Sequence, residues 1–153
     1  MYKSIKNIVK SHYLFLFMIV SLLNINTTYS QLVAIVNTSN NITNVSSSDF
    51  KSYFLGDKSK FPSGTNVSLV LSKEDNKVKE VFINIMGKKY NELMNIWLKK
   101  SLNDGWKSPT QFTNDSDVIS YVAKTQGALG FVNASSLNNL VKPITIDGKK
   151  QVD

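Results

Sequence analysis

After residue 30, short apolar runs alternate with segments whose apolar residues recur at helical spacing. Apolar runs of this length, bounded by polar or glycine-rich stretches, are typical of buried strands. They are LVAIV at 32–36, NVSLVL at 66–71, the end of TQGALGFV at 125–132, and VKPITI at 141–146. Because helical patterns lie between them, the sequence predicts one α/β domain of alternating strands and helices.

The first predicted helix begins near Ser46 and has an aromatic inner face. Ser46, with Asp49 three residues later, resembles a capping box in which Asp replaces Glu. Gly56 is suited to the position just after the helix. The aromatic residues at i, i+3 and i+4 are Phe50, Tyr53 and Phe54. This spacing places all three on the side that faces the core.

Two further helices are predicted between residues 77 and 100. The first should bury Val78, Val81, Phe82 and Ile85 and stop at Gly87, and the second should bury Tyr90, Leu93, Ile96 and Trp97. Lys99 and Lys100 are expected to lie in the last turn, where they complement the helix dipole. The following loop carries Trp106, which either covers the edge of the core or is exposed for a partner.

The last predicted helix is capped by Asn114 or Asp115 and leads into the glycine-containing turn. Its inward residues are Val118, Ile119, Tyr121 and Val122. We expect Gly127 to adopt a positive φ after this helix, and Gly130 to allow close packing of the strand that follows.

Residues 1–30 have the three-part pattern of a secretory signal peptide. A lysine-containing start precedes the apolar run LFLFMIVSLL at 14–23, and a polar stretch then ends at the small residue Ser30. The alternative is a retained membrane anchor, but the run is about half of the ~20 residues that span a bilayer. We therefore expect a mature domain of residues 31–153, periplasmic or secreted, which contacts the membrane only through the cleaved signal peptide.

The residue types missing from the mature chain restrict its chemistry. The only histidine is His12, inside the predicted signal peptide, and the chain has no Cys or Arg. Ser–His–Asp and Cys–His catalysis are thereby excluded, and zinc or copper sites are not expected. We expect a protein that is not an enzyme and has no cofactor. Its formal charge of +7 falls to +4 without the three lysines of residues 1–30, too little for a nucleic-acid-binding surface.

Several stretches, taken in order, resemble the phosphate-type solute-binding proteins of ABC transporters. They are FLGDKSKFPSGTNV at 54–67, VFINIMG at 81–87, VISYVAKTQGALGFV at 118–132 and ITIDG at 144–148. The resemblance implies a periplasmic-binding-protein-like lobe, with a mixed sheet flanked by helices. Receptors of this family close two such lobes over an oxyanion, and this chain is similar to the second lobe alone.

The resemblance places a candidate anion site directly after the strand 66–71. In the family an Arg and a Ser-Gly-Thr follow this strand at a helix N-terminus, whereas this chain reads SKEDNK at 72–77. Free backbone N–H groups at a helix start favour an anion, but Glu74 and Asp75 oppose it. The alternative is an ordinary capped helix start without a ligand. The candidate ligand-binding residues are Ser72, Lys73, Asn76 and Lys77, with the amide of Gly127 as a further contact.

Two functions and one mode of assembly remain open from the sequence. The resemblance implies an extracytoplasmic solute-binding protein that binds phosphate or another small oxyanion for ABC-type uptake or sensing. Its partner would be an ABC permease or an envelope sensor. The alternative is a ligand-free module that serves as a protein-interaction accessory in the cell envelope. In addition, two copies of the chain would be able to associate, each supplying the lobe that the other lacks.

Overall fold

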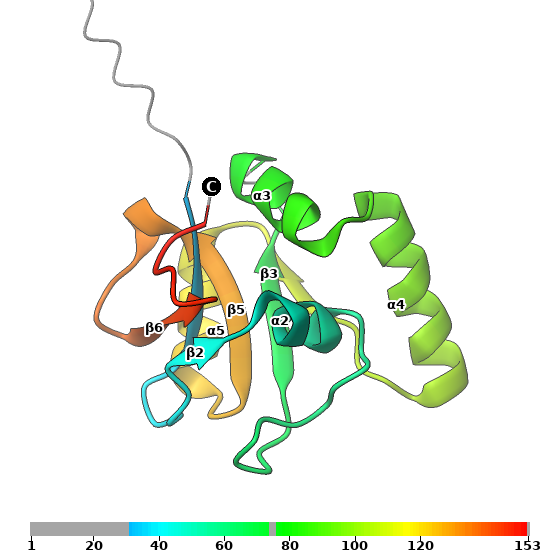
Figure 1. Cartoon of the computed structure of the whole chain (residues 1–153), viewed down its shortest axis with the longest axis horizontal. Helices are drawn as coiled ribbons and strands as arrows, with labels where there is room; N and C mark the ends of the chain where they lie inside the picture. Colours follow the sequence, from blue (N-terminus) through cyan, green and yellow to red (C-terminus); the bar gives the residue numbers. More distant parts are fainter. Residues whose placement is uncertain (1–30, 74–75, 153) are drawn as a thin grey trace, which may run out of the picture.

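The computed structural model describes residues 31–73 and 76–152 (Figure 1). The elements are β1 (Leu32–Asn37), β2 (Asn44–Val45), α2 (Ser47–Phe54), β3 (Ser68–Ser72), α3 (Asn76–Met86), α4 (Tyr90–Asp104), β4 (Thr110–Phe112), α5 (Asp115–Lys124), β5 (Ala128–Asn133), the short 3-10 helix η1 (Ala134–Ser136) and β6 (Val141–Ile146). The predicted α/β class, with a mixed sheet between helices, is confirmed. Strands β2 and β4 were not predicted, because two or three residues are too few to carry a pattern.

The six strands form one sheet in the order β2-β6-β1-β5-β3-β4. Strand β1 runs antiparallel to its neighbours β5 and β6, whereas the pairs β3–β5, β3–β4 and β2–β6 are parallel. The carboxyl ends of β3, β4 and β5 therefore share one edge of the sheet, which we call the carboxyl edge. In parallel α/β sheets ligands bind beyond this kind of edge, so the carboxyl edge is a candidate position for a binding site.

Helices cover both faces of the sheet and enclose two hydrophobic cores. Helices α2, α3 and α4 lie on one face and α5 lies on the other (Figure 1). Strand β1 is buried along its whole length because successive side chains enter opposite cores. In the larger core, the rings of Phe82 and Phe131 are stacked with their centroids 4.6 Å apart. Trp97 is buried beside them and donates from Nε1 to the carbonyl oxygen of Phe54 over 2.7 Å.

Two of the predicted helix starts are capped as expected. The side chain of Ser46 accepts a hydrogen bond from the Asp49 N–H over 3.0 Å, and the side chain of Asn114 accepts from the Asp117 N–H over 2.9 Å. The residues after α2 and α3 also behave as predicted, since Gly56 and Gly87 have positive φ. Local sequence signals thus fixed these boundaries.

The predicted end of α4 was wrong. The helix continues to Asp104 and is closed by Gly105, whose φ is +64°. Lys99 and Lys100 therefore lie before the last turn and do not complement the dipole at the helix end. Lys100 is instead paired with Asp57, with 2.6 Å between Nζ and Oδ1.

The loop after α4 is anchored on the larger core through Trp106. The indole ring is half-buried and packs over Gly56, where an added Cβ would lie 2.7 Å from the ring. The prediction that Trp106 covers the edge of the core is confirmed. Gly56 is thus required both for its positive φ and for the space that the ring occupies.

Gly127 does not have the positive φ that we predicted. Glycine is required there by close packing, because an added Cβ would lie 2.0 Å from the carbonyl oxygen of Asn66. The predicted close packing of Gly130 is confirmed, since a Cβ there would lie 2.7 Å from Cγ1 of Val70. Both glycines allow β5 and its preceding turn to lie against the segment that forms β3.

The predicted signal peptide and the acidic residues Glu74 and Asp75 lie outside the described residues. Within residues 31–73 and 76–152, no helix combines the length and the apolar character that crossing a bilayer requires.

Candidate functional site

Ser72 is the last residue of β3 and lies at the carboxyl edge. It is 5% exposed, and its buried Oγ has no hydrogen-bond partner among the described residues. Its backbone is held in the sheet, because Ser72 pairs with Phe112 and the next N–H, from Lys73, donates to Phe112 O over 2.9 Å. A buried hydroxyl without a partner costs about 1–3 kcal/mol. Such an unsatisfied group calls for an explanation, and a bound ion or water that supplies the missing hydrogen bond is one.

The alternation of β3 places the Ser72 side chain on the face covered by α5. Leu69 and Leu71 enter the core beneath α2, α3 and α4, whereas Val70 enters the core beneath α5. Because side chains alternate along a strand, Ser72 follows Val70 to the α5 face.

Asp115, the first residue of α5, brings a second unpartnered group to the carboxyl edge. Its Oδ2 accepts a hydrogen bond from the Asn133 N–H over 2.9 Å, whereas its buried Oδ1 has no partner among the described residues. The next N–H of β5, from Ala134, donates to Gln31 O beside β1. Successive N–H groups of a strand point to opposite sides, so the Asn133 N–H points toward β3. The carboxylate of Asp115 therefore lies beyond the end of β3, on the same face as Ser72.

The helices that begin near the carboxyl edge differ in the acidic groups that lie at their N-termini. At α2, Asp147 accepts hydrogen bonds from both the N–H and the hydroxyl of Ser47. Both bonds lower the pKa of Asp147, and the bond from the hydroxyl has the larger effect. At α5, Asn114 caps the helix and Asp115 and Asp117 stand in the first turn. Helix α3 has no acidic residue in its first turn. Among these helices, α3 is the one whose own first turn best suits an anion.

The structure brings together some of the sequence-predicted site residues. Ser72 and the exposed Lys73 lie at the carboxyl edge, and Asn76 and Lys77 are the first residues of α3. Gly127 instead precedes the first residue of β5 and therefore lies at the opposite edge, which we call the amino edge. It is not brought together with the other four residues.

Asp115 is the site residue that sequence reasoning missed. The sequence suggested only a helix cap, and no periodicity or motif connects residue 115 with the end of β5. Its position beyond the end of β3 arises because β3 lies between β4 and β5 in the sheet. For the described residues, no cluster of three or more His, Cys, Asp or Glu side chains is arranged to hold a metal ion.

Comparison with known proteins gives a structural result. No family model and no curated protein sequence matches the chain. Its structure is similar to an ABC-type phosphate transport receptor from Vibrio cholerae, with a TM-score of 0.62 and 16% identity over 78% of this chain and 47% of that one. It is also similar to a substrate-binding protein with bound phosphate from Clostridium perfringens, with a TM-score of 0.62 and 18% identity over 78% and 46%. PstS from Borrelia burgdorferi gives a TM-score of 0.57 and 11% identity over 78% and 48%.

These likenesses establish the fold and its extent. The chain spans a little less than half the length of the solved structures that it matches. The fold-level resemblance to phosphate-type receptors predicted from the sequence is confirmed, and its extent agrees with a single lobe. At identities below one fifth, function does not follow from the fold.

Proposed function

We propose that this chain is an extracytoplasmic solute-binding protein that binds phosphate or a similar oxyanion at the carboxyl edge, for ABC-type uptake or sensing. Residues 1–30 would direct secretion, and residues 31–153 would form the mature domain. The observation that carries the proposal is the buried hydroxyl of Ser72 at the end of β3, which has no partner among the described residues. The shared fold supports it, because the solved structures with this fold include phosphate receptors.

Each group in the proposed site has a separate role. The Ser72 hydroxyl donates a hydrogen bond, the Lys73 ammonium supplies positive charge, and the first N–H groups of α3 point toward the anion. Asp115 opposes binding, and so do Glu74 and Asp75, which directly precede α3 in the sequence. A like charge about 4 Å from an anion costs on the order of 4 kcal/mol at an effective dielectric constant near 20. With no Arg in the chain to form a bidentate contact, we expect weak binding, with a Kd of about 1 mM.

Calorimetric titration of residues 31–153 with phosphate, sulfate and molybdate at low salt tests the proposal. This segment contains every described element and both cores. We expect saturable binding that weakens at least fivefold in Ser72→Ala and is unchanged in Ser120→Ala, an exposed serine on α5. An absence of heat with all three anions, together with melting curves that do not shift, would contradict the proposal.

One observation favours the alternative of a protein-interaction module. Three apolar side chains recur every four residues along α4 and are exposed, namely Met94 at 40%, Leu98 at 58% and Leu102 at 75%. They form one stripe on the helix, and such stripes often contact another protein. Under this alternative, a Leu98→Ser, Leu102→Ser variant should lose retention on an envelope fraction while Ser72→Ala keeps it. The association of two copies is a separate possibility. Sedimentation velocity with and without phosphate tests it, because a dimer sediments faster than a monomer.

A further inference from the structure

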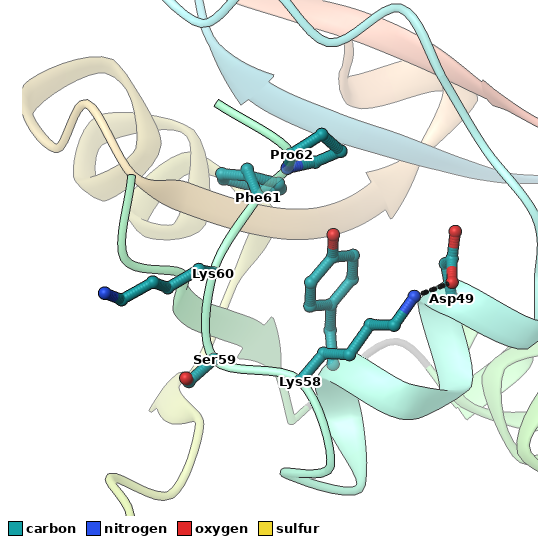
Figure 2. A pocket seen from close by; sticks show the side chains of 7 residues that line it. Asp49, Lys58, Ser59, Lys60, Phe61 and Pro62 are labelled. Carbon is teal, nitrogen blue, oxygen red and sulfur yellow. Dashed lines mark hydrogen bonds and ion pairs between the residues drawn. The ribbon is translucent and has the colours of Figure 1, made fainter. Parts of the chain in front are cut away.

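A hollow lies between α2 and the loop formed by residues 57–66, away from the carboxyl edge. Its volume is about 360 Å³, within the range of about 300–1,000 Å³ that is common for small-molecule sites. Figure 2 shows the side chains that line it. The lining residues are Asp49, Tyr53, Lys58, Ser59, Lys60, Phe61 and Pro62.

Backbone hydrogen bonds hold the loop wall of this hollow in place. The Val67 N–H donates to Ser59 O over 2.8 Å, and the Phe61 N–H donates to Thr65 O over 2.9 Å. The Gly64 N–H closes the tip by donating to Phe61 O over 2.9 Å. Phe61 is itself buried. The wall is therefore formed without a ligand, which lowers the entropy lost on binding.

Tyr53 lines the hollow and supplies it with a polar group, its hydroxyl. The residue is 2% exposed, and its ring packs edge-on against Phe61 with 5.5 Å between centroids. Within the part of the chain that the structure describes, its hydroxyl makes no hydrogen bond. Burial, and then the charge of Asp49, raise the pKa of Tyr53, so the hydroxyl stays neutral and is able to donate and accept. The hydroxyl is therefore free to exchange hydrogen bonds with an occupant of the hollow.

The charged groups of the hollow disfavour an ionic occupant. Lys58 reaches Asp49 and forms an ion pair with it, whereas the Lys60 side chain extends away from that pair (Figure 2). An anion would be repelled by the Asp49 carboxylate and would compete with it for the Lys58 ammonium. A cation would be repelled by Lys58 and Lys60. A neutral group that both donates and accepts hydrogen bonds avoids both kinds of charge repulsion.

We propose that this hollow is a binding site for a neutral, polyhydroxylated ring, that is, a saccharide. The apolar face of such a ring packs on the exposed Pro62, which follows the buried Phe61, since the C–H groups of a sugar ring match a pyrrolidine surface. Its hydroxyl groups bond to the Tyr53 hydroxyl and to the ion pair of Asp49 with Lys58. The site is separate from the proposed oxyanion site and does not depend on it.

A titration of ¹⁵N-labelled residues 31–153 with glucose and N-acetylglucosamine, followed by ¹H–¹⁵N correlation NMR spectra, tests this inference. We expect saturable shifts confined to residues 49–62, with millimolar affinity for at least one of the two sugars. Glucuronate and glucosamine carry a charge on a similar ring, and we expect each to bind at least threefold more weakly than the uncharged sugar. Tighter binding of a charged analogue would overturn the assignment to a neutral ligand.

Matched variants locate the site. Tyr53→Phe and Asp49→Asn should each weaken sugar binding at least threefold without changing the melting temperature by more than a few degrees. Asp57→Asn, which breaks the other exposed ion pair of this region, and Ser72→Ala should leave it unchanged. Titrations without saturable shifts, or shifts that Tyr53→Phe and Asp49→Asn leave unaltered, would overturn the proposal whether or not phosphate binds elsewhere.

Discussion

The two edges of the sheet differ in how completely their atoms are packed and paired. At the amino edge, Gly127 lies so close to Asn66 that no side chain fits between them. At the carboxyl edge, Ser72 Oγ and Asp115 Oδ1 are buried without partners in the part of the chain that the structure describes. Burial therefore has a different result at each edge. At the amino edge it gives close backbone packing, whereas at the carboxyl edge it leaves polar atoms without hydrogen bonds.

This difference predicts opposite effects of small substitutions at the two edges. Adding atoms at the amino edge forces the backbone apart, and the cost appears in stability. Removing polar atoms at the carboxyl edge relieves an unsatisfied group, and the cost appears in binding. Variants that keep the fold but change the ligand therefore belong at the carboxyl edge.

The largest expected effect is that of Gly127→Ala. An alanine Cβ at this position would overlap the Asn66 carbonyl oxygen, so the turn before β5 must move. We expect a loss of about 3 kcal/mol in the free energy of unfolding, measured by urea denaturation. Ser120→Ala serves as the exposed control. An unchanged midpoint for Gly127→Ala would show that the turn yields easily and would remove the contrast between the edges.

Asp115→Asn should strengthen oxyanion binding. The amide keeps an oxygen for the Asn133 N–H and removes the negative charge from the carboxyl edge. We expect at least a tenfold lower Kd for phosphate, which corresponds to about 1.4 kcal/mol. Asp117→Asn is the matched control in the same helix turn. Equal affinity in Asp115→Asn and the wild type would place the anion elsewhere.

Ser72→Ala should lower affinity without lowering stability. The substitution removes a buried hydroxyl that has no partner in residues 31–73 and 76–152, so we expect the free energy of unfolding to be unchanged or to rise by about 1 kcal/mol. Denaturant titration in the absence of anions measures this. A clear destabilisation would indicate that the hydroxyl already has a partner and would weaken the case for a ligand.

The smallest expected effect is that of Asp147→Asn. The Asp147 carboxylate accepts hydrogen bonds from Ser47 at the N-terminus of α2, where an anion would otherwise be favoured. Hydrogen bonds from Ser47 lower the pKa of the exposed Asp147 below its ordinary value of 3.8. A lowered folded-state pKa stabilises the fold above the ordinary value, and this contribution is lost as the pH falls through the folded-state value. Asp147→Asn should therefore lower the melting temperature slightly at neutral pH and by less in strong acid. A difference that does not depend on pH would contradict this account.

Short-range signals in the sequence determined most of the fold. The aromatic spacing of α2, the caps at Ser46 and Asn114, and the glycines after α2 and α3 act within a few residues, so they are visible without a structure. The same signals failed where the pattern was ambiguous. The end of α4 was placed too early because lysines inside a helix resemble those of a last turn.

The tertiary structure alone decided which residues meet. We predicted that Gly127 is needed for a positive φ. The structure shows instead that glycine is needed because Asn66, in a segment that β pairing brings beside the turn, leaves no room for a side chain. The sequence predicted Asp115 only as a possible helix cap, whereas the structure places it beyond the end of β3, because β3 lies between β4 and β5. The sequence thus determined the class of fold and the position of Ser72 and Lys73 at the end of a strand. Long-range pairing, which local patterns do not encode, decided their surroundings.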